Sequence, residues 1–223
     1  DFCLSRGLGD VYKRQGTFNV LKRNQEEISR RAGHGIEIVM VADLDVARAK
    51  ELVGSHCEVV NDGNLVVSNP DIDIVVELIG GYGIAKDLVL KAIANGKHVV
   101  TANKALLATH GDEIFKAAQD KGVMVAYEAA VAGGIPIIKA LREGLTANRI
   151  EWIAGIINGT TNFILSEMRD KGLDFDTVLK EAQRLGYAEA DPTFDIEGVD
   201  AAHKATLMSV SYTHLRAHET GRN

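Results

Sequence analysis

The sequence is poor in cysteine and in clustered basic residues, and it contains no long apolar run. Its two cysteines, Cys3 and Cys57, are too few for a disulfide framework and have no histidines at zinc-ligand spacing, so we expect a reducing, cytoplasmic setting. No apolar stretch approaches the length of a membrane span. The net charge of -6 and the lack of a basic stripe exclude a general nucleic-acid binder. We therefore expect a soluble protein with neither nucleic acid nor membrane as a partner.

What is present is an alternation of short apolar runs with amphipathic segments across residues 16–126. Strands are predicted at residues 36–42, 72–78, 98–101 and 123–126, and helices at residues 16–31, 46–52, 82–94 and 104–121. This order predicts an α/β fold with a Rossmann-type doubly wound parallel sheet, which binds ligands at the carboxyl ends of its strands.

The two ends of the chain lack this periodicity. Residues 1–15 begin with no evident strand, and Gly7-Leu8-Gly9 starts like a dinucleotide fingerprint whose third glycine position is held by Tyr12, so we read the match as a coincidence. Residues 209–223 drop the apolar period of the preceding helix, and both ends resemble translated adapter sequence. We expect two tails outside the α/β pattern and a sheet without its first strand and glycine loop.

Two polar positions follow predicted strands. Asp43 comes after the strand at residues 36–42, where a carboxylate either meets the adenosine ribose of a dinucleotide or caps the next helix. Nearby Arg48 and Lys50 suit a phosphate, so NAD and NADP both stay open. Thr101 and Lys104 follow the strand at residues 98–101, and they form either a polar cap or the nicotinamide side of a site.

The second half begins with a crossover rich in small residues, followed by more helices. Helices are predicted at residues 134–142, 161–168 and 175–185. A strand is predicted at residues 150–157, with Trp152 in the core. Residues 158–161, Asn-Gly-Thr-Thr, are explained equally well as a turn and as part of a polar pocket.

Residues 181–204 combine several carboxylates with one lysine. Asp200 and Lys204 are four residues apart and would share one face of a helix, which by itself predicts a surface ion pair. The fixed positions of this stretch resemble the signature of homoserine dehydrogenases: Ala182-x-x-x-Gly186-Tyr187-Ala188-x-x-Asp191-Pro192-x-x-Asp195-Ile196-x-Gly198-x-Asp200-x-x-x-Lys204. Residues 99–108, VVTANKALLA, resemble a second segment of the same family. The resemblance spans residues 16–208.

This resemblance implies an oxidoreductase that interconverts L-homoserine and L-aspartate 4-semialdehyde with NADP or NAD, in threonine, methionine and isoleucine biosynthesis. It divides the chain into an incomplete nucleotide-binding domain at residues 16–130 and a truncated catalytic domain at residues 131–208, and it implies a homodimer. By resemblance, Lys204 and Lys104 are catalytic, and the other site residues are Glu189, Asp195 and Asp200 for substrate, Thr101, Lys104, Gly186 and Asp43 for cofactor, and Glu128, Val131, Gly133 and Ile135 for a sodium ion.

Two other interpretations remain. The chain is either another amino-acid dehydrogenase on the same sheet, or a noncatalytic fragment with an unpaired sheet edge. Because the expected fold lacks its glycine loop, we predict weak or absent cofactor binding by these 223 residues.

Overall fold

The computed structural model describes the backbone of residues 2–5 and 10–219, and the side chains of residues 15–209 and 211. The chain divides into two compact units, Asp1–Gly134 and Ile135–Asn223. Each unit is described by itself.

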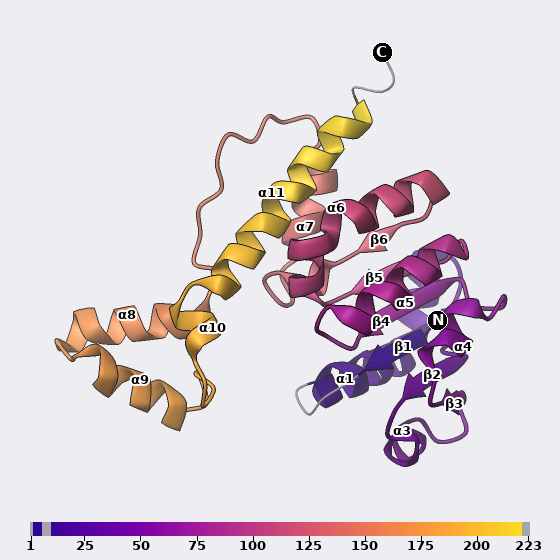
Figure 1. Ribbon diagram of the computed structural model, residues 1–223, viewed down its shortest axis with the longest axis horizontal. Helices are drawn as coiled ribbons and strands as arrows, with labels where there is room; N and C mark the ends of the chain where they lie inside the picture. The colour runs from indigo at the N-terminus through magenta and orange to yellow at the C-terminus, as the bar shows by residue number, and fades with distance from the viewer. Residues whose placement is uncertain (1, 6–9, 220–223) are drawn as a thin grey trace. The chain divides into compact units, whose positions relative to one another are not determined.

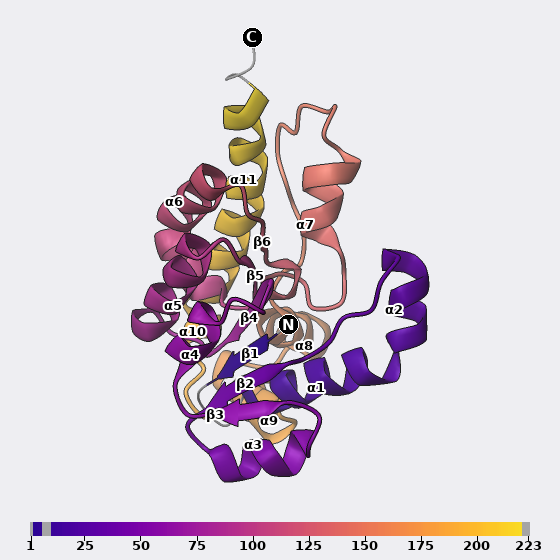
Figure 2. The same ribbon diagram turned by 90° about the vertical axis from the view of Figure 1, so that its right-hand side faces the viewer.

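The first unit is built on a six-stranded sheet in which every neighbouring pair is parallel. The order is β3-β2-β1-β4-β5-β6, and Figure 2 shows α1 on one side of the sheet and α5 and α6 on the other. The strands are β1 (Phe2–Ser5), β2 (Met40–Asp43), β3 (Glu58–Val60), β4 (Ile74–Leu78), β5 (His98–Thr101) and β6 (Val125–Ala126). This arrangement confirms the predicted doubly wound α/β fold.

The prediction that the sheet lacks its first strand is wrong. Strand β1 lies between β2 and β4, and Phe2 is in register with Met40 on one side and Val75 on the other. A run of four residues is too short to display a strand period, but two flanking apolar strands satisfy its backbone N–H and C=O groups on both edges. The Gly7-Leu8-Gly9 pattern lies outside the described residues.

Helices follow the strands, and their limits agree with local sequence signals. The helix predicted at residues 16–31 is two helices that meet at Asn24, and the second ends on Gly33 with a left-handed φ of 81°. The predicted ranges of β5 and α6 are confirmed to the residue. The helices of this unit are α1 (Asp10–Arg23), α2 (Gln25–Ala32), α3 (Val46–Val53), α4 (Gly63–Ser68), α5 (Gly83–Ala94), α6 (Lys104–Lys121) and the 3₁₀ turn η1 (Glu128–Ala130).

The core of this unit lies between the sheet and α4, α5 and α6. Most of the fully buried apolar side chains come from one face of each helix, and others lie in β4 or just before it. They include Val66, Val67, Ile72, Val75, Ile93, Leu106, Leu107 and Ile114.

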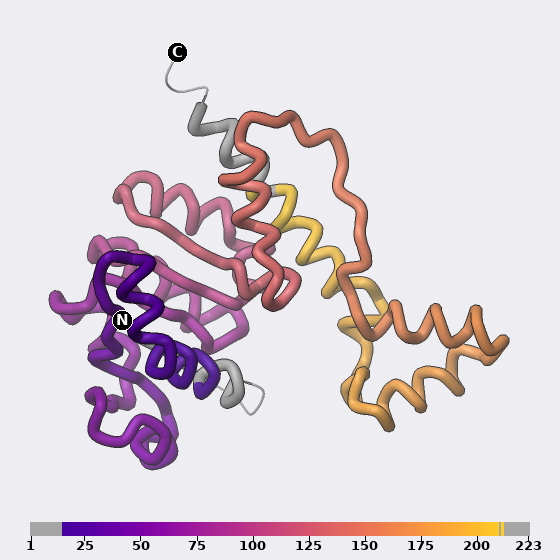
Figure 3. Tube along the Cα trace, turned by 180° about the vertical axis from the view of Figure 1, so that it is seen from behind, coloured from indigo at the N-terminus to yellow at the C-terminus, as the bar shows by residue number. Residues whose placement is uncertain are grey.

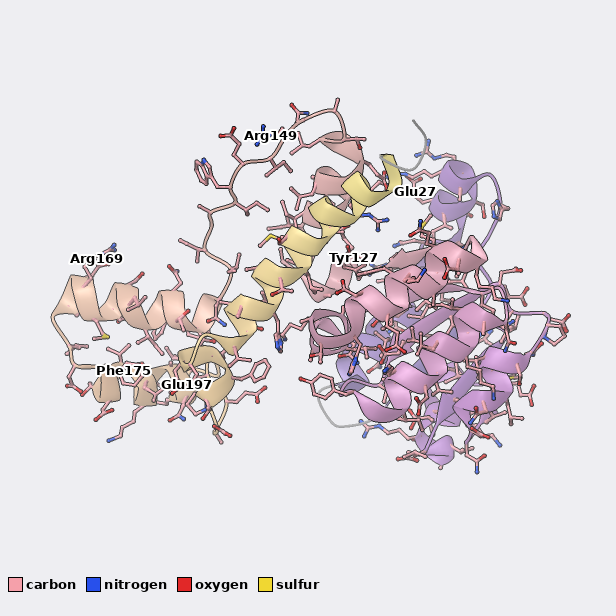
Figure 4. All side chains as sticks on the ribbon, turned by 45° about the horizontal axis from the view of Figure 1, so that its top comes forward. Glu27, Tyr127, Arg149, Arg169, Phe175 and Glu197 are labelled. Carbon is pink, nitrogen blue, oxygen red and sulfur yellow. The ribbon has the colours of Figure 1, made fainter. Side chains whose placement is uncertain are left out.

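The second unit is helical among the described residues (Figure 1). Helices α8 and α9 form a hairpin around Ile164, Val178, Ala182 and Ala188. Glu197, labelled in Figure 4, lies in the turn between α10 and α11. The elements are α7 (Ile137–Lys139), the π-helical turn η2 (Ala140–Gly144), α8 (Gly159–Lys171), α9 (Phe175–Arg184), α10 (Thr193–Ile196) and α11 (Val199–Glu219).

Residues 150–157 were predicted to form a strand, and this is wrong. They follow Arg149 as an irregular loop, whose uncoiled trace is visible in Figure 3. Trp152 and Ile156 are each 78% exposed, so the expectation that Trp152 belongs to the core is wrong as well. A strand needs a neighbouring strand to pair its backbone, and no strand of the described residues lies beside this segment.

Helix α11 continues past Met208 to Glu219, into residues whose sequence shows no helical period. Among the described residues, no helix has the length and apolar character needed to cross a membrane.

Candidate active site

An open cavity of about 610 Å³ lies in the second unit, at the start of α8 and α11. Four of the residues predicted for the site line it: Gly186, Asp195, Asp200 and Lys204. The remaining lining residues are Asn158, Gly159, Thr160, Phe163 and Tyr187. Two segments that the sequence separates by about forty residues are therefore brought to one polar cavity.

Lys204 and Asp200 form a buried ion pair in this cavity, not a surface pair. The Nζ atom of Lys204 lies 2.5 Å from Oδ2 of Asp200, and their side chains are only 19% and 7% exposed. The Lys116–Asp120 pair on α6 has the same spacing but side chains that are 75% and 61% exposed. Lys204 also donates a 2.7 Å hydrogen bond to the carbonyl of Ile157. Burial of both groups makes their pairing obligatory, since an unpaired charge there would be costly.

Asn158 connects the two carboxylates of the cavity. Its side-chain Nδ2 donates to Oδ1 of Asp195 at 2.7 Å and to Oδ2 of Asp200 at 3.0 Å. Its Oδ1 accepts from the backbone N–H of Thr161 at 2.8 Å and so caps α8. The sequence placed Asn158 in a turn or a polar pocket, but nothing in its spacing indicated a link to Asp195 and Asp200.

Gly186 lines this cavity, whereas Glu189 does not. Gly186 has a left-handed φ of 78° in the turn after α9 and lines the cavity. Beside it, the Thr160 hydroxyl donates to the carbonyl of Tyr187 at 2.7 Å, and both residues also line the cavity. Glu189, predicted for substrate binding, is exposed and is not among the lining residues.

In the first unit, Thr101 and Lys104 lie at the carboxyl end of β5 as predicted. Thr101 is buried, and its hydroxyl donates to Oε2 of Glu77 at 2.6 Å while accepting from the N–H of Asn103 at 2.9 Å. Asn103 in turn donates through Nδ2 to the carbonyl of Gly81 at 2.7 Å and caps α6. Lys104 is the first residue of α6 and is half-buried.

Glu77 is the functional candidate that sequence reasoning missed in this unit. It is fully buried at the end of β4, and its Oε1 accepts from the N–H groups of Ile79 and Gly80 at 2.7 and 3.1 Å. The carboxylate therefore binds the loop after β4 to Thr101, beside it in the sheet. A charged residue inside an otherwise apolar strand was the signal that could have identified it.

The loop after β4 has the shape expected beside a dinucleotide. Gly80 and Gly81 have left-handed φ values of 76° and 70°, and a Cβ added to Gly81 would meet no atom within 4 Å. Open space therefore borders this turn at the carboxyl edge of the sheet, which suits close approach of a ligand to backbone.

Asp43 ends β2, and its alternative role as a helix cap is wrong. Oδ1 of Asp43 accepts from the N–H of Asp45 at 2.9 Å, but Asp45 is the residue that caps α3, by accepting from the N–H of Arg48 at 3.1 Å. The cofactor role of Asp43 stays a prediction.

The residues predicted to hold sodium occupy a tight loop. Glu128 begins the 3₁₀ turn η1, Val131 is buried, and Ile135 is 64% exposed. Between them, Ala132 and Gly133 have left-handed φ values of 58° and 57°. Among the described residues no group of three or more His, Cys, Asp or Glu side chains could hold a metal ion, so a cation here would rely on carbonyl oxygens.

Comparison with known proteins gives a consistent result over both units. The family model "Homoserine dehydrogenase, NAD binding domain" matches residues 7–128, and the model "Homoserine dehydrogenase" matches residues 136–220. The chain is 64% identical over 208 residues to a homoserine dehydrogenase of Pseudomonas aeruginosa and 63% identical over 203 residues to that of Neisseria gonorrhoeae, covering in each case 91% of this chain and 46% of the relative. The chain thus spans about half the length of the curated relatives it matches.

Solved structures agree with these matches. A homoserine dehydrogenase from Thiobacillus denitrificans has a TM-score of 0.85 and 66% identity, covering 94% of this chain and 47% of that one. A hyperthermophilic archaeal homoserine dehydrogenase in complex with NADPH has a TM-score of 0.76 and 29% identity, covering 95% of this chain and 69% of that one.

Proposed function

The chain belongs to the homoserine dehydrogenase family, and from this premise we propose that it interconverts L-homoserine and L-aspartate 4-semialdehyde with NADPH or NADH. The first unit would bind the nucleotide and the second the substrate. The observation that carries this proposal is the cavity that gathers Asn158, Asp195, Asp200 and Lys204. In this role the protein would act in threonine, methionine and isoleucine biosynthesis in the cytoplasm.

The charges of the cavity suit an amino-acid substrate. Asp195 and Asp200 together carry two negative charges and Lys204 one positive charge, so one negative charge remains for an incoming ammonium group. Among the described residues, the only side chain that donates a hydrogen bond to the Asp195 carboxylate is that of Asn158, which leaves the second oxygen of Asp195 to receive a substrate N–H. Exposed Glu189 would reach the same ammonium group from outside the cavity.

Lys204 has the geometry of a proton donor. Its ammonium group has three N–H bonds, and two of them point to Oδ2 of Asp200 and the carbonyl of Ile157. The third is directed to the substrate oxygen in this proposal, where it stabilises the alkoxide that develops during aldehyde reduction and then protonates it. Asp200 orients Lys204 for this task.

A bound nicotinamide cofactor would supply the hydride. Thr101, Lys104, Gly186 and Asp43 would contact it, and the open turn at Gly81 supports a ligand at this edge of the sheet. Lys104 would orient substrate and nicotinamide together. Both NADP and NAD fit these residues.

We also propose a sodium ion near Glu128, Val131, Gly133 and Ile135. The fit rests on the donor set, because carbonyl oxygens suit a hard monovalent cation. The carbonyls of Glu128 and Ile135 accept backbone hydrogen bonds from Val131 and Ile137, at 3.2 and 2.8 Å, and a carbonyl oxygen has two lone pairs. A homodimer is the assembly we propose for the complete enzyme.

Replacement of Lys204 by alanine tests the mechanism. We expect Lys204→Ala to lower the turnover number by about 10²- to 10⁴-fold with little change in the KM for L-aspartate 4-semialdehyde, because the lysine acts mainly in the transition state. The loss of NADPH absorbance on adding the aldehyde measures both constants. Lys116→Ala, at the exposed pair of the same spacing, is the control and should match the wild type.

The same assay also tests the reaction itself. Turnover with other aldehydes or keto acids but not with L-aspartate 4-semialdehyde would indicate another amino-acid dehydrogenase. An unchanged turnover number in Lys204→Ala would remove Lys204 from the mechanism.

A further inference from the structure

The side-chain amide of Asn158 has every hydrogen-bonding position occupied. Oδ1 accepts from the N–H and from the hydroxyl of Thr161, at 2.8 and 2.9 Å. The two hydrogens of Nδ2 go separately to Asp195 and Asp200. The opposite amide orientation would point an N–H at a backbone N–H and a carbonyl at two carboxylates, so the surroundings allow only this one.

A matched helix cap in the same unit shows what is special about Asn158. Asp174 caps α9 and, like Asn158, accepts from both the N–H and the hydroxyl of a threonine three residues later, Thr177, at 3.0 and 2.7 Å. Asp174 is exposed and is not among the residues that line the cavity, whereas Asn158 is 7% exposed and lies in it. Capping a helix needs only an acceptor, so the two donated bonds of Asn158 serve another purpose.

We propose that Asn158 is a positioning residue that sets the separation and orientation of the Asp195 and Asp200 carboxylates, so that one receives the substrate ammonium while the other holds Lys204. This role rests on the proposed function for its ligand. One NH₂ group that donates to both carboxylates keeps them on the same side of the cavity in spite of their mutual repulsion. It also joins α8 to α10 and α11, which carry the two aspartates.

The arrangement assigns different tasks to the two carboxylates. Oδ2 of Asp200 accepts from both Asn158 and Lys204, at 3.0 and 2.5 Å, and is thereby saturated. Asp195 accepts from Asn158 through Oδ1, and among the described side chains none donates to its Oδ2. The ammonium group of an α-amino acid would therefore bind at Asp195, and an analogue without the amino group would leave that carboxylate unpaired.

The deciding experiment compares Asn158→Ser with Asp174→Ser. Serine is as good a cap as asparagine or aspartate, but its side chain is too short to reach Asp195 and Asp200 from position 158. We expect Asn158→Ser to shift the carboxyl ¹³C resonances of Asp195 and Asp200 and to weaken L-homoserine binding about tenfold by calorimetry, the loss expected for a hydrogen bond to a charged group. Asp174→Ser should change neither quantity.

The two readouts separate this inference from the proposed function. If the carboxyl resonances of Asp195 and Asp200 stay at their wild-type positions in Asn158→Ser, the positioning role is wrong, whatever the protein binds. If the wild type itself does not bind L-homoserine, the proposed function fails while the resonances still decide the role of Asn158.

A second variant removes both donors without shortening the side chain. Asn158→Asp keeps an oxygen acceptor of the same length for the cap but removes both donors. It must shift the same two carboxyl resonances, and a spectrum identical to wild type at Asp195 and Asp200 would overturn the proposal.

Discussion

At the residue scale, burial decides whether an ion pair only adds a little stability or also fixes the direction of its charged groups. The Lys116–Asp120 pair and the Asp200–Lys204 pair both join residues four apart on a helix, yet only the second is withdrawn from water. An exposed pair contributes about 0.3–0.5 kcal/mol and little else. A buried pair fixes the direction of both groups, and this is the property a proton donor needs.

Glu77 is the second buried charge that acts through its geometry. As a carboxylate it is an acceptor only, and it faces three donors, from Ile79, Gly80 and Thr101. We expect Glu77→Gln to lower the free energy of unfolding by about 1–3 kcal/mol, because the amide would turn an N–H toward the Thr101 hydroxyl and leave a donor unpaired.

Urea unfolding followed by circular dichroism measures this loss. Glu58→Gln, at an exposed position of β3, is the matched control and should stay within about 0.5 kcal/mol of the wild type. Equal stability of Glu77→Gln and the wild type would show that the hydrogen-bond directions at this carboxylate do not matter.

At the scale of elements, helix starts hold the candidate residues in each of the two units. Asn103 caps α6 and is bonded to Gly81, and Asn158 caps α8 and is bonded to Asp195 and Asp200. In each case one amide satisfies a helix terminus and also holds a neighbouring segment. Loops that carry function are thereby tied to regular elements.

The loop at residues 150–157 has no regular structure, and the fluorescence of Trp152 measures its exposure to water. It is the single tryptophan of the chain, and at 78% exposure it should emit at the long wavelengths typical of indole in water and be strongly quenched by acrylamide. Fluorescence of the folded protein measures this directly, with free tryptophan as the reference. Blue-shifted emission that resists quenching would mean that this segment is packed against another surface.

At the scale of the whole molecule, a buried lysine of the first unit makes stability depend on pH. Lys97 is 4% exposed, and its Nζ donates to the carbonyls of Asn69 and Ile72. Burial lowers the pKa of Lys97 below its ordinary value of 10.5, although Asp73 and Asp71 oppose the shift. Below both pKa values the lysine is charged in the folded and unfolded states, and its desolvation then opposes folding.

This shift predicts a pH dependence of the free energy of unfolding. Between the lowered pKa and 10.5 the unfolded chain binds more protons than the folded one, so the contribution of Lys97 to stability rises with pH in that window. We expect the difference in unfolding free energy between wild type and Lys97→Met to grow in favour of the wild type as the pH approaches 10.5. Urea unfolding at a series of alkaline pH values measures it, and a difference that is flat or falls would contradict the assignment.

The sequence by itself determined the parts of this protein that depend on local pattern. The alternation of apolar runs with amphipathic segments predicted the parallel α/β sheet, and β5 and α6 were located to the residue because caps and apolar period act within a few residues. The signature through Lys204 identified the family, and it named Gly186, Asp195 and Asp200, which line one cavity.

Only the tertiary structure decided which partners these residues have. Residues 2–5 become a central strand because β2 and β4 pair with both of its edges, whereas residues 150–157, with a stronger strand pattern, pair with no strand in the part of the chain that the structure describes. The burial of the Asp200–Lys204 pair and the double donation by Asn158 likewise come from segments distant in sequence. Hydrogen-bond satisfaction and desolvation are set by neighbours in space, and a local pattern carries no information about them.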